Sequence, residues 1–150
     1  MYRDAYQYLQ EIREAYSYIY NKNEDLKYYD YMLEISGINY DPDRVQSSPK
    51  KDGLEMQAIK HLEVIEEIKK DIAKKMEWRT KRIDQATDLI CKIESQEQQE
   101  VLRMRYINNM SWSEILEARG CNDTRNQYRL HARAVKALQK ILDSHSIATT

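Results

Sequence analysis

Five cations near the C-terminal end of the chain recur at spacings that place them along one side of a helix: Arg125, Arg129, Arg133, Lys136 and Lys140. Such a row can bind phosphate oxygens, which is the chemistry of contact with a nucleic-acid backbone. At 100° per residue, the other half of the same helix carries Leu130, His131, Ala134, Val135, Leu138, Ile141 and Leu142, with Tyr128 at its edge. The pattern predicts an amphipathic helix that packs one face on a core and presents cations on the other.

The start of this predicted helix carries side chains suited to reading bases. Arginine can make a bidentate contact to guanine, and asparagine can make one to adenine. Cations further along the helix are better placed to meet phosphate. The candidate DNA-binding residues are Thr124, Arg125, Asn126 and Arg129 at base edges, with Arg133 and Lys136 on phosphate. For any single one of these residues, a solvated surface position is the competing interpretation.

Other chemistry is poorly represented in the sequence. His61, His131 and His145 are scattered, and Cys91 and Cys121 form no CxxC pair and lie near no histidine pair at ligand spacing. A phosphate loop, a nucleophile elbow and a zinc spacing are all missing from the sequence. We therefore expect no enzymatic activity, no metal and no cofactor. Free thiols favour a reducing cytoplasm. We expect no membrane-spanning helix, because the sequence contains no run of 18 consecutive apolar residues.

The elements that would position the cationic helix can be read from its upstream neighbours. Residues 97–107 suit a short helix, and Asn108-Asn109 suits a turn. Ser111 and Glu114 form a capping box that opens a second short helix, and Gly120 ends it. Asn122, Asp123 or Thr124 then caps the long cationic helix. This order predicts a helix-turn-helix within residues 96–150.

Residues 1–95 are expected to form a helical hairpin or coiled-coil-like region. Residues 2 to about 35 carry tyrosines and aliphatic residues at steps of three and four, more typical of a packing face than of a platform for bases. A linker over 37–53 holds both prolines of the chain. Residues 54–93 form one long predicted helix with a heptad seam. Its a series is Leu62, Lys69, Met76, Ile83 and Ile90, and its d series is Ile65, Ile72, Arg79, Ala86 and Ile93. The predicted fold class is all-α, and the seam predicts packing on the N-terminal helix, on a second copy in a homodimer, or on both.

Charge is distributed unevenly along a chain whose formal net charge is only -1. The segment 119–140 holds six basic side chains, one of them Arg119, against the single acid Asp123. A local excess of this kind indicates either a binding patch or a solvated face.

Several of these segments together resemble a known family. Arg103-Met-Arg-Tyr-Ile, Ser111-Trp-Ser-Glu-Ile-Leu, Gly120 and Tyr128-Arg-Leu-His-Ala-Arg-Ala resemble region 4 of sigma factors. They resemble more closely a family of small phage and prophage proteins of Gram-positive bacteria, related to the ArpU and RinA type of late-transcription activators. Arg44-Val-Gln-Ser-Ser-Pro-Lys-Lys-Asp is similar to that family as well. One departure is that Asn126 and Gln127 stand where the family usually has an apolar β-branched residue.

The resemblance implies a phage or prophage transcription regulator in the cytoplasm of a bacterial host cell. Duplex DNA would be its main partner, with RNA polymerase as a further one. The alternative is a protein-interaction module that binds RNA polymerase or another protein without using DNA. Salt-dependent binding of duplex DNA by the purified protein distinguishes the two.

Overall fold

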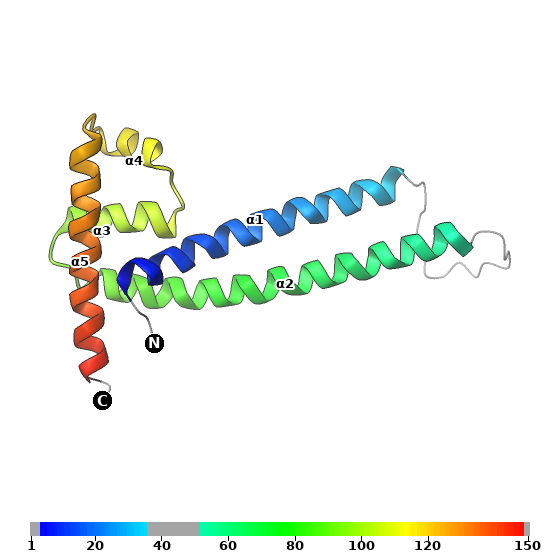
Figure 1. Cartoon of the computed structure of the whole chain (residues 1–150), viewed down its shortest axis with the longest axis horizontal. Coiled ribbons are helices and arrows are strands. Elements are labelled where there is room, and N and C mark those ends of the chain that lie inside the picture. Colours follow the sequence, from blue (N-terminus) through cyan, green and yellow to red (C-terminus); the bar gives the residue numbers. More distant parts are fainter. Residues whose placement is uncertain (1–3, 36–51, 149–150) are drawn as a thin grey trace. The chain divides into compact units, whose positions relative to one another are not determined.

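The computed structural model describes residues 4–35 and 52–148, and every regular element within those ranges is a helix. The all-α prediction is therefore confirmed. The helices are α1 (Ala5–Ile35), α2 (Asp52–Ile90), α3 (Gln96–Leu102), the π-helix η2 (Arg103–Ile107), α4 (Trp112–Arg119) and α5 (Thr124–Ala148), shown in Figure 1. No helix in the described part of the chain is long and apolar enough to span a membrane.

The predicted linker falls mostly on residues 36–51, which lie outside the described residues. Its last two residues do not belong to a linker, because α2 already begins at Asp52. Gly53 is accommodated in the first turn of this helix, where an added Cβ would meet nothing within 4 Å.

The chain divides into two compact units, and each is described by itself. Unit 1 comprises Met1–Ser17 and Glu77–Thr150, and unit 2 comprises Tyr18–Met76. The boundary thus differs from the predicted division near residue 95. The reason is that the first turns of α1 and the last turns of α2 share a core with the C-terminal helices.

Unit 1 is organised around one continuous core. Tyr8, Leu9 and Ile12 of α1 are fully buried there. They share the core with residues of every other helix of the unit: Ala86, Leu89, Ile90, Ile93, Val101, Leu102, Tyr106, Ile115, Ala134 and Leu138. Burial of this many large side chains supplies the main stabilising free energy of the unit.

Unit 2 is an antiparallel pair of helices with a much thinner interior. Ala58, Ile65, Ile68 and Ile72 are buried, at steps of seven, three and four residues. Contacts between α1 and α2 run in opposite directions along the two helices. The Tyr29 ring packs edge-on against the His61 ring, with centroids 5.5 Å apart. Further along α2, Lys22 Nζ lies 3.9 Å from the Asp71 carboxylate, and Lys75 Nζ lies 5.5 Å from the Tyr18 ring centroid. The steps of seven, three and four residues between the buried side chains of α2 are those of a heptad seam.

The buried seam follows four of the five predicted d positions and part of the predicted a series. Ile65, Ile72, Ala86 and Ile93 of the d series are buried. In the a series, Ile90 is fully buried and Ile83 packs against the core, whereas Met76 and Lys69 are exposed. Two further buried positions, Ile68 and Leu89, lie one residue before a positions. Because α1 follows this seam in both units, it is covered within one chain.

Candidate nucleic-acid interface

The turn between α4 and α5 is fixed by hydrogen bonds at both helix ends. The Ser111 hydroxyl accepts from the backbone N–H of Glu114 at 3.2 Å, and the Glu114 carboxylate accepts from the Ser111 N–H at 3.3 Å. The predicted capping box is therefore present. At the other end of α4, Gly120 has φ 64°, a left-handed conformation that favours glycine.

Asp123 caps the N-terminus of α5. One of its carboxylate oxygens accepts from the backbone N–H of Arg125 at 3.0 Å and of Asn126 at 3.4 Å. Of the three caps that the sequence allowed, Asp123 is thus the one that satisfies the first turn. Only residues 120–123 separate α4 from α5, so a four-residue turn joins the two helices (Figure 1).

The inner face of α5 is anchored by apolar and aromatic contacts. Ala134 and Leu138 are fully buried. His131 hydrogen-bonds to the Tyr106 hydroxyl at 2.7 Å, and the Trp112 ring packs edge-on against His131 with centroids 4.9 Å apart. Burial raises the pKa of Tyr106 to about 12, and burial together with the nearby Arg105 charge lowers the pKa of His131. These contacts fix the rotation of α5 about its axis.

Arginines from α1 and α2 hold the chain between η2 and α4. Arg13 donates to the carbonyl oxygens of Arg105 at 2.8 Å and Met110 at 3.2 Å. Arg79 donates to the carbonyl oxygen of Ile107 at 3.0 Å. These bonds satisfy carbonyl groups in and after the last turn of η2, and they connect the segment between η2 and α4 to α1 and α2.

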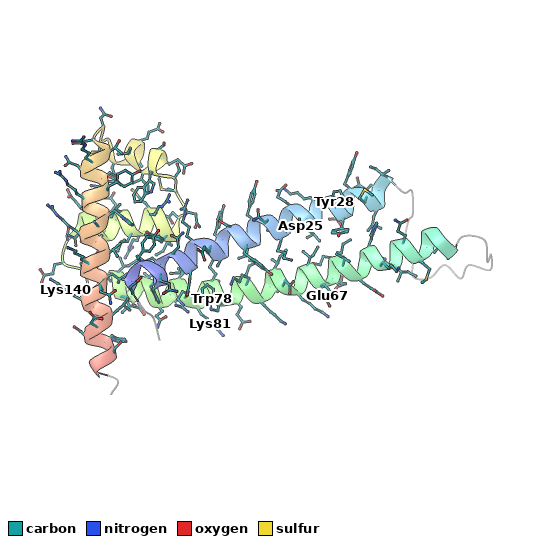
Figure 2. The ribbon with its side chains drawn as sticks, in the orientation of Figure 1. Asp25, Tyr28, Glu67, Trp78, Lys81 and Lys140 are labelled. Carbon is teal, nitrogen blue, oxygen red and sulfur yellow. The ribbon has the colours of Figure 1, made fainter. Side chains whose placement is uncertain are left out.

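All six predicted site residues lie on the first four turns of α5 and are exposed: Thr124, Arg125, Asn126, Arg129, Arg133 and Lys136. Lys140 continues the row and projects outward from α5 in Figure 2. Among the ion pairs of the described residues, none includes a cation of this row. We call Arg125, Arg129, Arg133, Lys136 and Lys140 the cationic row.

Arg119 does not belong to this row, although it contributes to the local charge excess of the sequence. Its guanidinium lies 3.1 Å from the Glu100 carboxylate, and its side chain is only 14% exposed. Five of the six basic side chains in 119–140 therefore remain without an ion-pair partner among the described residues.

Two hollows border the cationic row. The first, which we call the Gln127 pocket, has a volume of about 290 Å³ and is lined by Glu97, Arg119, Cys121, Asn126, Gln127, Arg129, Leu130 and Arg133. The second has a volume of about 620 Å³, and Lys92, Arg133, Lys136 and Lys140 are among its lining residues. Arg133 lines both hollows and so connects them along the cationic row. Their other walls include Lys92, which precedes α3, and Glu97 and Gln98, which belong to α3.

This surface includes residues that were not among the predicted site residues, such as Lys92, Arg119 and Gln127. Lys92 follows α2 and Arg119 ends α4, and sequence spacing alone does not bring either to α5. Gln127 is 2% exposed, the one buried polar side chain in the described part of the chain. A polar residue on the apolar half of the predicted helix was the signal that could have found Gln127.

The described residues do not bring cysteine, histidine and carboxylate side chains together in metal-binding groups, and neither cysteine forms a disulfide. No group of three histidine, cysteine, aspartate or glutamate side chains there could hold a metal ion. Cys91 and Cys121 are free thiols, and Arg103 donates to the Cys91 sulfur at 3.0 Å.

The structure thus defines an all-helical protein with a short capped helix, a four-residue turn and a long helix bearing exposed cations. The chain belongs to the family described as "Protein of unknown function (DUF1492)", whose model matches residues 35–139. The match includes all six predicted site residues. It also includes every residue that lines the two hollows except Lys140 and Ile141, which lie beyond its end. No curated protein and no solved structure matches the chain.

Proposed function

We propose that this protein binds duplex DNA through α5 and regulates transcription. The observation that carries the proposal is the cationic row, which is exposed along its whole length while the opposite face of α5 is anchored in the core. Cations held on a rigid helix attract the phosphate backbone and release condensed counterions from it. The resemblance to phage and prophage regulators supports a role in phage or prophage gene expression in a bacterial cytoplasm.

The two ends of the row would contact different parts of the duplex. In a helix-turn-helix, the N-terminal part of the second helix reaches base edges. Thr124, Arg125, Asn126 and Arg129 occupy that part of α5, and all are exposed. Arg133 and Lys136 lie further along and would bind phosphate.

The test measures duplex affinity as a function of salt. Each phosphate contact contributes about 0.9 units to the slope of log affinity against log salt. Arg133→Ala or Lys136→Ala should flatten that slope and weaken binding to all sequences alike. Arg125→Ala or Asn126→Ala should instead reduce discrimination at the affected base pair by roughly 1–3 kcal/mol.

A triple variant supplies the decisive comparison. Arg125, Arg129 and Arg133 are replaced by alanine together, and the control replaces the exposed Lys69, Lys70 and Lys74 of α2, so that both proteins lose the same charge. The α5 variant should lose duplex binding and the α2 variant should keep it. Equal affinities for the two variants would exclude α5 as the DNA-binding element.

The rival proposal is a protein-interaction module that binds RNA polymerase or another protein. It is favoured by large side chains that are exposed in unit 2: Tyr20, Tyr28, Tyr31, Met56, Ile59 and Met76. Exposed groups of this kind often mark a surface used by a partner. Under this proposal the α5 triple variant would leave the activity of the protein in transcription unchanged.

Self-association forms part of the DNA-binding proposal, because two copies bound to two half-sites gain affinity. The predicted seam is covered by α1 within one chain, so a second copy would have to use other apolar side chains, such as the exposed set of unit 2. Sedimentation at increasing protein concentration measures the mass. A monomer at high concentration would remove the dimer from the proposal.

A further inference from the structure

We propose that the Gln127 pocket is a binding site for one phosphate group. The pocket lies between the start of α3, the end of α4 and the first turns of α5. Its affinity for phosphate does not depend on what α5 does elsewhere. That a DNA backbone supplies this phosphate rests on the proposed function.

Two hydrogen-bond donors in the pocket wall have no partner among the described residues. One is the side-chain Nε2 of Gln127, a residue that is only 2% exposed, and the other is Nε of Arg119. A buried donor without an acceptor is costly, and native proteins generally satisfy such groups. Both unpartnered atoms carry N–H groups, so the missing partner must be an acceptor.

The charges around the pocket favour an anionic acceptor. Arg119, Arg129 and Arg133 supply three guanidinium groups, whereas Glu97 lines the pocket and Glu100 pairs with Arg119 at 3.1 Å. One net positive charge therefore remains. Guanidinium groups suit phosphate because they offer several N–H donors in a fixed plane.

The size of the pocket fits the same ligand class. A volume of about 290 Å³ lies at the small end of ligand sites and is slightly under half the volume of the hollow beside Lys92. Asn126 and Arg129, predicted to read bases, also line this pocket. A phosphate held there would fix the register of α5 on a duplex, as helix N-terminal phosphate contacts do.

The first experiment titrates inorganic phosphate into the full chain at constant ionic strength, with chloride as the reference anion. The side-chain N–H signals of Gln127 and Arg119 are followed in a proton–nitrogen NMR spectrum. Both signals should shift and saturate together with phosphate. A response to chloride of the same size, or no shift at either side chain, would overturn the proposal.

Gln127→Met separates binding from folding, because methionine has a similar volume and no donor. Without phosphate, this variant should melt about 2–4 °C higher, the shift expected when a burial cost of about 1 kcal/mol is removed from a chain of this size. Its phosphate affinity should fall about tenfold. If the amide oxygen instead accepts from Arg119, Gln127→Met would melt lower and phosphate would have no effect on either protein, which would overturn the proposal.

Two further variants provide matched controls. Glu97→Gln removes the carboxylate that lines the pocket and should raise phosphate affinity by about threefold, because one repulsive charge is lost. Arg129→Gln should lower that affinity, whereas Lys74→Gln, which removes an exposed cation of α2 outside the pocket, should leave it unchanged. Equal effects of these two changes would indicate nonspecific charge attraction and would overturn the site.

A short duplex distinguishes the source of the phosphate. If the backbone occupies the pocket, the duplex shifts the Gln127 signal and free phosphate competes with it. Saturable phosphate binding without duplex binding would contradict the proposed function and leave the pocket standing as a site for free phosphate or a phosphorylated small molecule. Duplex binding that is unaffected by Gln127→Met, with no phosphate response, would contradict the pocket alone.

Discussion

Units 1 and 2 both pair a segment of α1 with a segment of α2, yet they bury very different interiors. Unit 1 has fully buried large side chains from α1 through α5, including Tyr8, Leu102 and Leu138. Among the described residues, unit 2 buries four apolar side chains of α2, all of them within the seam, and leaves tyrosines such as Tyr28 and Tyr31 more than half exposed. The same seam therefore produces a closed core only where additional helices cover it.

The comparison teaches where the stability of the chain resides. A two-helix pair offers each residue one neighbouring helix, whereas residues of unit 1 have neighbours from several elements. Helices packed on only one partner gain little beyond their own seam. We expect unit 2 to open at a lower free energy than unit 1.

The largest effect should come from shortening one core side chain in each unit. Leu138→Ala creates a cavity in a fully buried site and should cost about 4–5 kcal/mol of unfolding free energy, the upper end for such changes. Ile72→Ala, at a site that is 9% exposed, should cost about 2 kcal/mol. Urea unfolding followed by helical circular dichroism measures both. Equal losses would contradict the difference between the two interiors.

Removing an inward-facing cation should have the next largest effect. Arg79 lies on the seam, donates to the Ile12 carbonyl at 3.4 Å and the Ile107 carbonyl at 3.0 Å, and stacks over the Tyr16 ring. Arg79→Met should destabilise unit 1 by about 1–3 kcal/mol because the Ile107 and Ile12 carbonyls lose a charged hydrogen-bond donor. Lys81→Met is the control, since its bond to Glu77 is exposed and should matter by less than about 0.5 kcal/mol.

The pH dependence of unit 1 should carry the signature of His131. Burial, and next the charge of Arg105, lower the pKa of His131 below its ordinary value of 6.5. The unfolded chain therefore takes up the proton first as the pH falls. The stabilisation is complete above about pH 6.5 and is lost progressively below it. His131→Gln keeps an acceptor for Tyr106 but does not titrate, so its melting temperature should fall less between about pH 7.5 and 5.5. An identical fall in both proteins would show that His131 does not contribute.

The smallest effects should come from one substitution made in two places. Gly120→Ala places a side chain at φ 64° with open space around it, so only backbone strain of about 1 kcal/mol opposes it. Gly53→Ala, in the first turn of α2, also meets nothing within 4 Å. There alanine should be neutral or stabilise by up to about 1 kcal/mol, because it favours the helix. The two changes should thus shift the melting temperature in opposite directions.

The sequence predicted the helices well because their signals are local. The Ser111 capping box, the left-handed Gly120 and the apolar face of α5 each follow from residues within a few positions of one another. The exposure of the six site residues follows from the same periodicity. None of these predictions required knowledge of a distant part of the chain.

The errors arose where a distant partner decides the outcome. Within the a series, Met76 looks suitable for a seam but is exposed, and Ile68, which was not assigned to the seam, is buried. Arg79 appeared to interrupt the seam, but carbonyl groups of α1 and η2 accept its hydrogen bonds. The Gln127 pocket is formed by three helices, so spacing within one segment could not predict it.

The length of the cationic row limits how any duplex can lie against it. From Arg125 to Lys140 the α5 axis advances about 22 Å, at about 1.5 Å per residue. The major groove is only about 12 Å wide. A straight rod of that length cannot keep all five cations within one groove when it lies across it, so its outer end must pass over a sugar–phosphate strand. Under the proposed function, this rigid helix would impose a fixed offset between the base pairs contacted at its first turn and the phosphate strand contacted at its outer end.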